Sequence, residues 1–304
     1  MIDGNIIKTR ILVIGSNGML GQRLTKVFAN LADVELLTAS AEEKSFYEGV
    51  EYKTLDITNK QGVKEIILNF FPDFVINAAA FTNVDQSESE RELAWKINVN
   101  GVENVALYCW TIDAHLIHIS TDYIFNGKNG PYTEDAIPSP INYYGRSKLA
   151  AENSIRTSGV RFTILRTNVL YGPTSFGRPD YVKWVVDSLK AGQQIRIVSD
   201  QINNPTFIDD LSTAINRVIQ FSKEGIYNIG GAELLSRLDF TIKIADFFNL
   251  DKSLIIPITT DQLKQPAPRP LRSGLVNLKA GAELGYKPLR LEETLFIIRK
   301  ELGL

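Results

Sequence analysis

The sequence predicts an α/β fold in which helices cover both faces of a doubly wound parallel sheet. Short apolar runs rich in β-branched residues alternate with amphipathic stretches, and this alternation is typical of right-handed βαβ units. A glycine-rich turn follows the first apolar run, at residues 15–21. We expect a main domain over residues 1–170, with a returning segment near 200–230, and a smaller C-terminal domain over 171–304.

The expected elements follow from the apolar periodicity. Six apolar runs predict strands at residues 10–14, 34–40, 52–56, 73–77, 114–120 and 162–166. Amphipathic stretches predict helices from about residue 20 and over about 60–69, 88–110 and 144–157. Turn signals at 171–173 and 264–270 make the second half less regular. A later helix starts near Leu211, and either Asp209 or Asp210 can cap it.

The glycine turn predicts a nucleotide site. Gly15, Gly18 and Gly21 lie between the first strand and the first helix, in the spacing G-x-x-G-x-x-G. Such glycines allow a tight turn, close approach of the backbone to a pyrophosphate, and close helix–sheet packing. The helix N-terminus also offers unpaired N–H groups to phosphates. Residues 1–170 are therefore expected to form a Rossmann-type NAD(P)-binding domain, and 171–304 mainly a substrate-binding domain.

The second strand bears on the choice of cofactor. Folds that prefer NAD usually place an acidic residue at the end of this strand, where it binds the ribose 2′-hydroxyl. Ala39 and Ser40 occupy that place, and Lys44 follows, so the sequence favours NADPH. Glu42 and Glu43 are also close, which leaves NADH open.

Tyr144 and Lys148 form the second motif. They are one helical turn apart and share a helix face. A free tyrosine has a pKa of about 10, and a nearby cation favours the phenolate. Thr121 follows the fifth expected strand, where its hydroxyl can hold a substrate carbonyl beside the phenol. The three groups suit proton transfer coupled to reduction of a ketone or oxidation of an alcohol.

Several small or polar residues share one edge of the expected sheet. Gly15, Asp56, Ala78, Ser120 and Thr121 all follow or end strands, and ligands bind at the carboxyl ends of parallel strands. These residues can therefore converge on one cleft. The run Ala78 to Ala80 fits backbone lying against a flat ligand, and it equally fits a tightly packed strand end.

Composition excludes several other classes of protein. The net charge of −2, without a long basic run, argues against nucleic acid or an anionic membrane as partner. Residues 1–5 lack the features of a signal peptide, and no apolar run approaches the roughly 20 residues that cross a bilayer. A cytoplasmic protein is expected. Cys109 is read as a buried hydrophobe, and His115 and His118 as structural, so no metal site is expected.

The separate motifs together resemble the extended short-chain dehydrogenase/reductase superfamily. They are the glycine turn, the Ser-Thr-Asp run at 120–122, and the Tyr144–Lys148 pair. Four finer segments resemble the dTDP-4-dehydrorhamnose reductases: 77–85 (NAAAFTNVD), 120–127 (STDYIFNG), 131–135 (PYTED) and 166–172 (RTNVLYG). The resemblance runs from about Arg10 to the C-terminal helix.

The resemblance implies an activity and a set of site residues. In that family NADPH reduces the C4 ketone of dTDP-4-dehydro-L-rhamnose to dTDP-L-rhamnose. Tyr144 would protonate the oxygen, Lys148 would hold the nicotinamide ribose and tune Tyr144, and Thr121 would hydrogen-bond the carbonyl. The implied cofactor-binding residues are Gly15, Asn17, Gly18, Met19, Leu20, Gly21, Asp56, Ile57, Ala78, Ala79, Ala80, Asn98, Tyr144 and Lys148. The implied substrate-binding residues are Thr82, Val84, Thr121, Asn168 and Arg269.

Some positions and functions stay open at this point. Val169 and Leu170 stand where many family members carry tryptophan, and Arg269 can either pair with a diphosphate or cap a loop. The resemblance also admits a related nucleotide-sugar reductase or epimerase. A non-catalytic NADP-binding regulatory subunit, like the β subunit of methionine adenosyltransferase, is a third reading. Asp122-Tyr123 after Thr121 differs from the Asp-Glu pair of dehydratases, which disfavours dehydration. A homodimer is left open.

Overall fold

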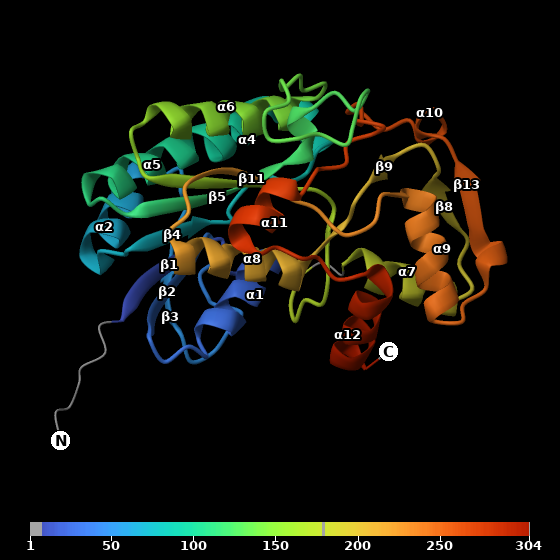
Figure 1. Cartoon of the computed structure of the whole chain (residues 1–304), viewed down its shortest axis with the longest axis horizontal. Coiled ribbons are helices and arrows are strands. Elements are labelled where there is room, and N and C mark those ends of the chain that lie inside the picture. The colour runs from blue at the N-terminus through green and yellow to red at the C-terminus, as the bar shows by residue number, and fades with distance from the viewer. Residues whose placement is uncertain (1–7, 178–179, 304) are drawn as a thin grey trace.

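A computed structural model describes residues 8–177 and 180–303 of the protein, so the expectation about residues 1–5 lies outside it. A seven-stranded sheet has the order β11-β6-β5-β4-β1-β2-β3, and all its strand pairs are parallel (Figure 1). The predicted doubly wound parallel sheet is confirmed. Its strands are β1 (Thr9–Ile14), β2 (Val34–Ser40), β3 (Glu51–Thr54), β4 (Phe74–Asn77), β5 (His115–Thr121), β6 (Phe162–Thr167) and β11 (Gly225–Ile229).

Helices cover both faces of this sheet. On one face lie α2 (Lys60–Phe70), α5 (Val102–Thr111) and α6 (Tyr143–Thr157), whose apolar side chains form one buried cluster with the strands. The other face is covered by α1 (Met19–Phe28), α8 (Ile208–Phe221) and α11 (Leu278–Leu284). Between β4 and α5 the chain forms α3 (Gln86–Ser89), α4 (Arg91–Trp95) and the π-helix η1 (Lys96–Gly101). The 3-10 helix η2 (Asp122–Ile124) follows β5.

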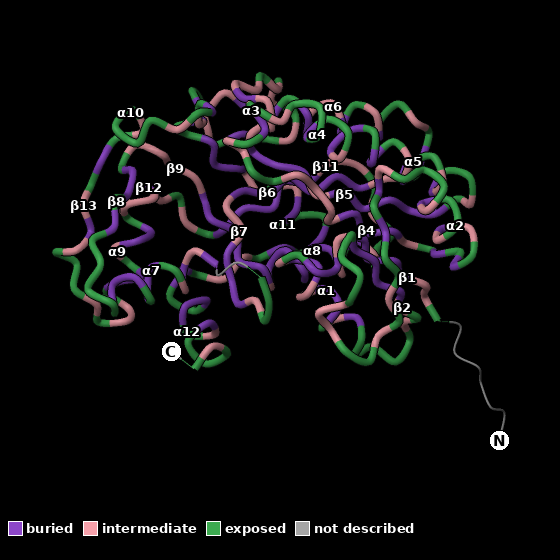
Figure 2. Tube along the Cα trace, turned by 180° about the vertical axis from the view of Figure 1, so that it is seen from behind, coloured by how far each residue is buried: buried purple, intermediate pink, exposed green. Residues whose placement is uncertain are grey.

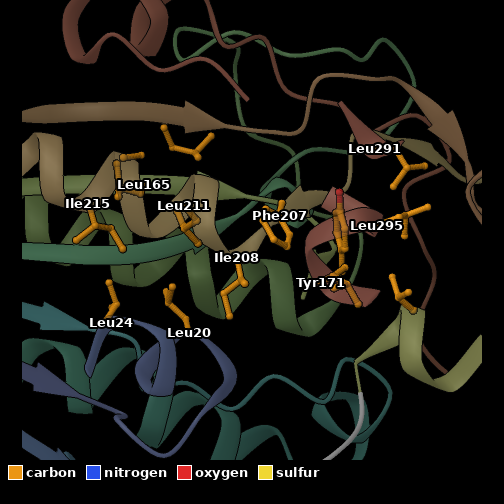
Figure 3. Packing of buried hydrophobic residues seen from close by; sticks show 14 of the residues in the cluster. Leu20, Leu24, Leu165, Tyr171, Phe207, Ile208, Leu211, Ile215, Leu291 and Leu295 are labelled. Atoms are coloured by element: carbon orange, nitrogen blue, oxygen red, sulfur yellow. The ribbon is translucent and has the colours of Figure 1, made fainter. Parts of the chain in front are cut away.

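Packing between α1 and α8 is the centre of the larger apolar cluster. Figure 3 shows Leu20 and Leu24 of α1 facing Ile208, Leu211 and Ile215 of α8. Leu24, Leu211 and Ile215 are fully buried. Truncating one such side chain to alanine typically costs about 2–5 kcal/mol of stability. This packing holds the glycine turn before α1 against the sheet.

A smaller region, formed by the C-terminal part of the chain, lies beside the main sheet. Figures 1 and 2 place β8, β9, β12 and β13 at the end of the molecule away from β2. The helices here are α7 (Tyr181–Lys190), α9 (Arg237–Phe247), α10 (Thr260–Leu263), α12 (Leu291–Leu302) and the 3-10 helix η3 (Lys252–Leu254). The short strands pair as β7 (Leu170–Tyr171) with β10 (Thr206–Phe207), β9 (Ile202–Asn203) with β12 (Leu235–Ser236), and β8 (Ile195–Val198) with β13 (Ile255–Ile258).

The chain returns to the main sheet through α8 and β11, which cover Ile208–Phe221 and Gly225–Ile229. The predicted domain division at residues 170 and 171 stays a prediction. No helix in the two described segments is long and apolar enough to cross a membrane.

Two local predictions differ from the structure. The helix predicted over 88–110 is divided, because α3 ends at Ser89 and a π-helix interrupts the path from α4 to α5. A Cβ at Gly101, the last π-helical residue, would lie 2.6 Å from Ile57, so the glycine allows this helix to approach the chain after β3. The later helix begins at Ile208, which puts Asp209 and Asp210 inside its first turn, and Phe207 is the N-cap residue.

Candidate active site

A cavity of about 680 Å³ opens at the carboxyl ends of β1, β2, β4, β5 and β6. This is the edge at which ligands bind in open α/β sheets. The sequence-predicted residues that line it are Gly15, Gly18, Met19, Leu20, Gly21, Asp56, Ile57, Ala78, Ala79, Ala80, Thr82, Val84, Thr121, Tyr144, Lys148 and Asn168. Asn17, Asn98 and Arg269 do not line it. Lining residues that sequence reasoning did not assign include Ser40, Ala41, Glu42, Asp122 and Tyr123.

The glycine turn is shaped by close backbone contacts. Gly15 has a φ of +81°, and a Cβ there would lie 2.6 Å from the Ala79 nitrogen. A Cβ at Gly21 would lie 2.1 Å from the Gly15 carbonyl oxygen. Gly18 is the N-cap residue of α1 and supplies no side-chain cap, so the first N–H groups of this ten-residue helix face the turn without a side-chain partner. The turn can therefore offer backbone donors to an anion.

Asn17 holds the loop after β2 in place. Its amide nitrogen donates to Glu42 Oε2 at 3.2 Å and to the Lys44 carbonyl oxygen at 2.9 Å, and its oxygen accepts from the Phe46 nitrogen at 2.9 Å. Asn17 therefore supports the site from behind the cavity wall. Its bonds bring a carboxylate, not Lys44, to the cavity wall.

Glu42 is an ionised group at this end of the cavity. Burial raises the pKa of its carboxyl, but hydrogen bonds from Ser40, from the backbone and from Asn17 together outweigh burial and hold the pKa below its usual value. A carboxylate attracts hydroxyl donors and repels phosphate. Sequence reasoning noted Glu42 and Glu43 as acidic residues close to the end of the second strand, without assigning Glu42 to the site. The signal that could have found it is its position two residues beyond the end of β2.

The N-terminus of α6 positions Tyr144. Asn142 caps the helix by accepting from the Gly145 nitrogen at 2.8 Å, and it donates to the Pro268 carbonyl oxygen at 2.9 Å. A Cβ at Gly145 would lie 2.1 Å from the Tyr123 carbonyl oxygen, so glycine lets the helix approach η2. The Tyr144 and Tyr123 rings then meet edge to face, with centroids 5.8 Å apart. Tyr144 is thereby fixed beside Thr121.

The pKa of the Tyr144 phenol is shifted in the direction opposite to the expectation. Burial and the nearby Asp122 charge raise the pKa of its phenol, and the Thr121 hydroxyl offsets this only in part. The predicted lowering by Lys148 is therefore wrong for this structure. Lys148 Nζ instead donates to the Ile119 carbonyl oxygen at 2.7 Å and lies 3.1 Å from His118 Nε2.

Lys148 is almost completely buried, with 2% of its surface exposed. Burial lowers the pKa of its amine to about 8, although the Glu152 charge raises it. Burial and the Lys148 charge also lower the pKa of His118 well below its ordinary value. His118, interpreted from the sequence as structural, thus directly contacts a candidate functional residue.

Thr121 and Asp122 form a buried polar pair at the end of β5. Thr121 Oγ1 donates to Asp122 Oδ1 at 3.1 Å and accepts from the Tyr123 nitrogen at 3.2 Å. Ser273 Oγ donates to Asp122 Oδ2 at 2.5 Å. Burial raises the pKa of the Asp122 carboxyl to about 7, and these hydrogen bonds lower it only in part.

Three predicted site residues have polar partners in the protein. Arg269 forms a two-point ion pair with Asp85, at 2.8 and 2.9 Å, and also donates to the Ala267 carbonyl oxygen. Asn98 accepts a hydrogen bond from the Phe81 nitrogen, and it donates to the Phe81 carbonyl oxygen and to the Ser147 hydroxyl. Asn168 lines the cavity while its amide donates to Asn204 and accepts from Thr206. Their predicted ligand contacts stay predictions.

A buried ion pair supports β5 and β6 behind the cavity. Arg166 and Glu152 lie 2.8 Å apart with side chains 3% and 1% exposed, and Ser120 donates to the same carboxylate at 2.5 Å. Among residues 8–177 and 180–303 no group of three or more His, Cys, Asp or Glu side chains could hold a metal ion.

A parallel sheet with a glycine turn after β1 and a tyrosine–lysine helix at the same cavity defines the short-chain dehydrogenase/reductase class. Within that class the chain belongs to the family described as RmlD substrate binding domain, whose model matches residues 9–302. The predicted family is confirmed.

Proteins similar to this chain carry several names. The chain is 34% identical to the spore coat polysaccharide biosynthesis protein SpsK of Bacillus subtilis, over 94% of this chain and 95% of that protein. It is 33% identical to the dTDP-4-dehydrorhamnose reductase of Aggregatibacter actinomycetemcomitans, over 95% and 98%. It is also 31% identical to the methionine adenosyltransferase 2 subunit beta of Xenopus laevis, over 88% and 80%.

A solved structure extends the similarity to three dimensions. The dTDP-4-dehydrorhamnose reductase from Bacillus anthracis, in complex with NADP, is 32% identical and superposes with a TM-score of 0.86. The match covers 97% of this chain and 99% of that one. The fold of this chain is therefore that of a solved NADP complex.

Proposed function

We propose that the protein reduces the C4 ketone of dTDP-4-dehydro-L-rhamnose to dTDP-L-rhamnose with NADPH. The observation that carries this proposal is one cavity that joins the glycine turn to Thr121, Tyr144 and Lys148. A relative that this chain matches over 98% of its length is a dTDP-4-dehydrorhamnose reductase. The activity belongs to the oxidoreductases.

The residues at the glycine turn fit a dinucleotide. The backbone at Gly15 and Gly21 packs so closely that a Cβ at either would meet other backbone atoms at 2.6 Å or less, which leaves the turn free of side chains. Gly18 leaves the first N–H groups of α1 without a side-chain cap, as pyrophosphate binding requires. We propose that Asp56 and Ile57 border the adenine and that Ala78, Ala79 and Ala80 lie along the dinucleotide.

The chemical step then follows from the other end of the cavity. NADPH, when bound, supplies the hydride that adds to the C4 carbon of the sugar. Tyr144 donates its phenolic proton to the C4 oxygen, and its raised pKa keeps that proton in place at neutral pH. Thr121 donates a hydrogen bond to the same oxygen, and Lys148 holds the nicotinamide ribose. A positioned acid of this kind typically contributes 10²–10⁴-fold.

The cofactor end accepts NADPH while carrying a carboxylate. Glu42 lines the cavity beside Ser40, at the place where a ribose 2′-substituent is read. Because carboxylate and phosphate repel each other, we propose that NADH is also accepted. Dissociation constants for the two reduced cofactors, measured by nicotinamide fluorescence, test this.

We propose that the sugar nucleotide lies over the outer part of the cavity. Thr82, Val84 and Asn168 line the cavity together with Thr121. Val169 and Leu170 also line it, so aliphatic side chains occupy the place of the tryptophan expected in many family members. Arg269 would bind the diphosphate only if it left Asp85, because its donors already bond there.

The direct test mixes purified protein with NADPH and dTDP-4-dehydro-L-rhamnose and follows the absorbance of the reduced nicotinamide. Rapid oxidation that depends on the sugar is expected. Tight NADPH binding without oxidation would move the assignment to another nucleotide-sugar reductase or epimerase, or to a regulatory subunit.

The second candidate function is a non-catalytic regulatory subunit. The 31% identity to the methionine adenosyltransferase 2 subunit beta favours it. Calorimetric titration with a catalytic methionine adenosyltransferase subunit separates the two readings. Association without ketone reduction supports the regulatory role, and reduction without association supports the reductase.

We also propose a cytoplasmic homodimer whose partner molecule is a small nucleotide sugar, with neither nucleic acid nor membrane as a partner. Light scattering on the purified protein reports the oligomeric state. Cell fractionation reports the compartment.

A further inference from the structure

The hydroxyl of Thr121 has one hydrogen and two lone pairs. One lone pair accepts from the Tyr123 nitrogen at 3.2 Å. The hydrogen points to Asp122 Oδ1 at 3.1 Å. An ionised carboxylate can only accept, so this bond keeps the hydrogen as long as Asp122 carries a charge. Thr121 then has no hydrogen to donate toward a ketone oxygen in the cavity.

Asp122 is buried among few charged groups. It is 1% exposed, and Ser273 occupies its second oxygen. None of the ion pairs found within the described residues includes Asp122. The groups that face it are Tyr123 on its own element, Tyr144 on α6, and Arg237 at the start of α9, which acts at longer range. Burial without a paired cation favours the neutral acid, with a pKa of about 7.

We propose that Asp122 is a positioning residue whose protonated form frees the Thr121 hydrogen to point into the cavity. The protonated carboxyl donates to the second lone pair of Thr121 Oγ1 and still accepts from Ser273 through its other oxygen. Thr121 then uses its own hydrogen for the ketone oxygen. Asp122 exchanges no proton with the substrate, because Tyr144 supplies that proton. This proposal rests on the proposed ketone reduction.

The pH dependence of turnover is the first test. Deprotonation of Asp122 removes the Thr121 donor, so kcat is expected to fall as pH rises through about 7. Lys148, with a pKa lowered to about 8, titrates in the same direction at higher pH. In Asp122→Asn the amide nitrogen donates to Thr121 and the amide oxygen accepts from Ser273 at every pH. The variant is expected to keep the low-pH kcat within a few fold and to move the alkaline midpoint up by about one pH unit.

Two further variants make the result specific. Ser273→Ala removes a donor that favours the ionised carboxylate, so it is expected to move the midpoint upward in the same direction. Asp210→Asn is the matched control, because Asp210 is also buried with a pKa raised to about 6, mainly by burial, but bonds the Leu289 backbone and does not line the cavity. Its profile should match that of the unchanged protein. If Asp122→Asn loses activity at every pH or keeps the original midpoint, the proposal is overturned.

Infrared spectroscopy separates this proposal from the proposed reaction. The difference spectrum between the unchanged protein and Asp122→Asn should show a protonated carboxyl band near pH 6 that has largely disappeared by about pH 8. Presence of the band without any ketone reduction would leave the protonation intact and remove the proposed function. Absence of a titrating band in a protein that reduces the ketone would remove the positioning role alone.

Discussion

The two ends of the cavity are lined by different chemical groups. The nucleotide end consists of glycine and alanine backbone, where an added Cβ would lie as little as 2.1 Å from another atom. The chemical end consists of buried polar side chains, and burial is the largest cause of the pKa shifts of Tyr144, Lys148 and Asp122. The first end depends on shape and the second on protonation. Changes of pH should therefore alter turnover more than cofactor binding.

The largest expected effect comes from Tyr144→Phe. Loss of the proton donor should lower kcat by about 10²–10⁴-fold, while the dissociation constant of NADPH changes by about twofold or less, because the phosphate site is untouched. Single-turnover kinetics and fluorescence titration measure the two quantities. Tyr143→Phe is the control, since this neighbouring tyrosine does not line the cavity. Equal losses of turnover and cofactor binding would contradict the assigned role.

The pH dependence of stability should reveal the buried Lys148. Its pKa is lowered from 10.5 to about 8, so above pH 8 the folded protein holds fewer protons than the unfolded chain. Stability should therefore rise as pH increases from about 8 toward 10.5, by on the order of 3 kcal/mol. Denaturant titrations of the protein and of Lys148→Met measure this. If Lys148 titrates at its usual pKa, the difference in stability between the protein and Lys148→Met should not change with pH over this range.

An added methyl group should damage the nucleotide end through shape alone. In Gly21→Ala the Cβ meets backbone at 2.1 Å, which we expect to cost about 1–3 kcal/mol of stability and to weaken NADPH binding. Gly281→Ala in α11 is the control, because its Cβ would meet its nearest atom at 3.6 Å. That change should leave binding unaltered. Thermal unfolding with and without NADPH compares them, and a Gly21→Ala protein that binds normally would argue against the tight turn.

The smallest expected effect is electrostatic. Glu42→Gln removes a charge that the proposed site places beside the ribose, so NADPH should gain about threefold to tenfold in affinity relative to NADH, or on the order of 1 kcal/mol. Glu43→Gln, outside the cavity lining, is the matched control. Fluorescence titration of both cofactors gives the ratio. No change in that ratio would mean that Glu42 does not read the 2′-position.

Local patterns made much of the fold and site predictable. The strands, the glycine turn and the Tyr144–Lys148 pair each depend on neighbours within a few residues. The interruption before α5 was missed because it depends on Gly101 meeting Ile57 across the fold. The raised pKa of Tyr144 was missed for the same reason, since it arises from burial and from Asp122 on another element.

Long-range partners explain the remaining differences. Arg269 was expected at the ligand, and its preference for Asp85 joins residues 184 positions apart. Ser273 reaches Asp122 across 151 positions, which no spacing rule in the sequence indicates. Asn17 was expected to contact the cofactor, and it supports the loop that carries Glu42.

The buried pair of Arg166 and Glu152 constrains how this sequence can change over generations. Losing either partner alone leaves an uncompensated charge in the core, at a cost of about 3–5 kcal/mol, which is a large part of the usual margin of stability. Replacing both by well-packed apolar residues can be nearly neutral. Descendants of this chain should therefore keep both residues or lose both, because each intermediate with one partner would be selected against.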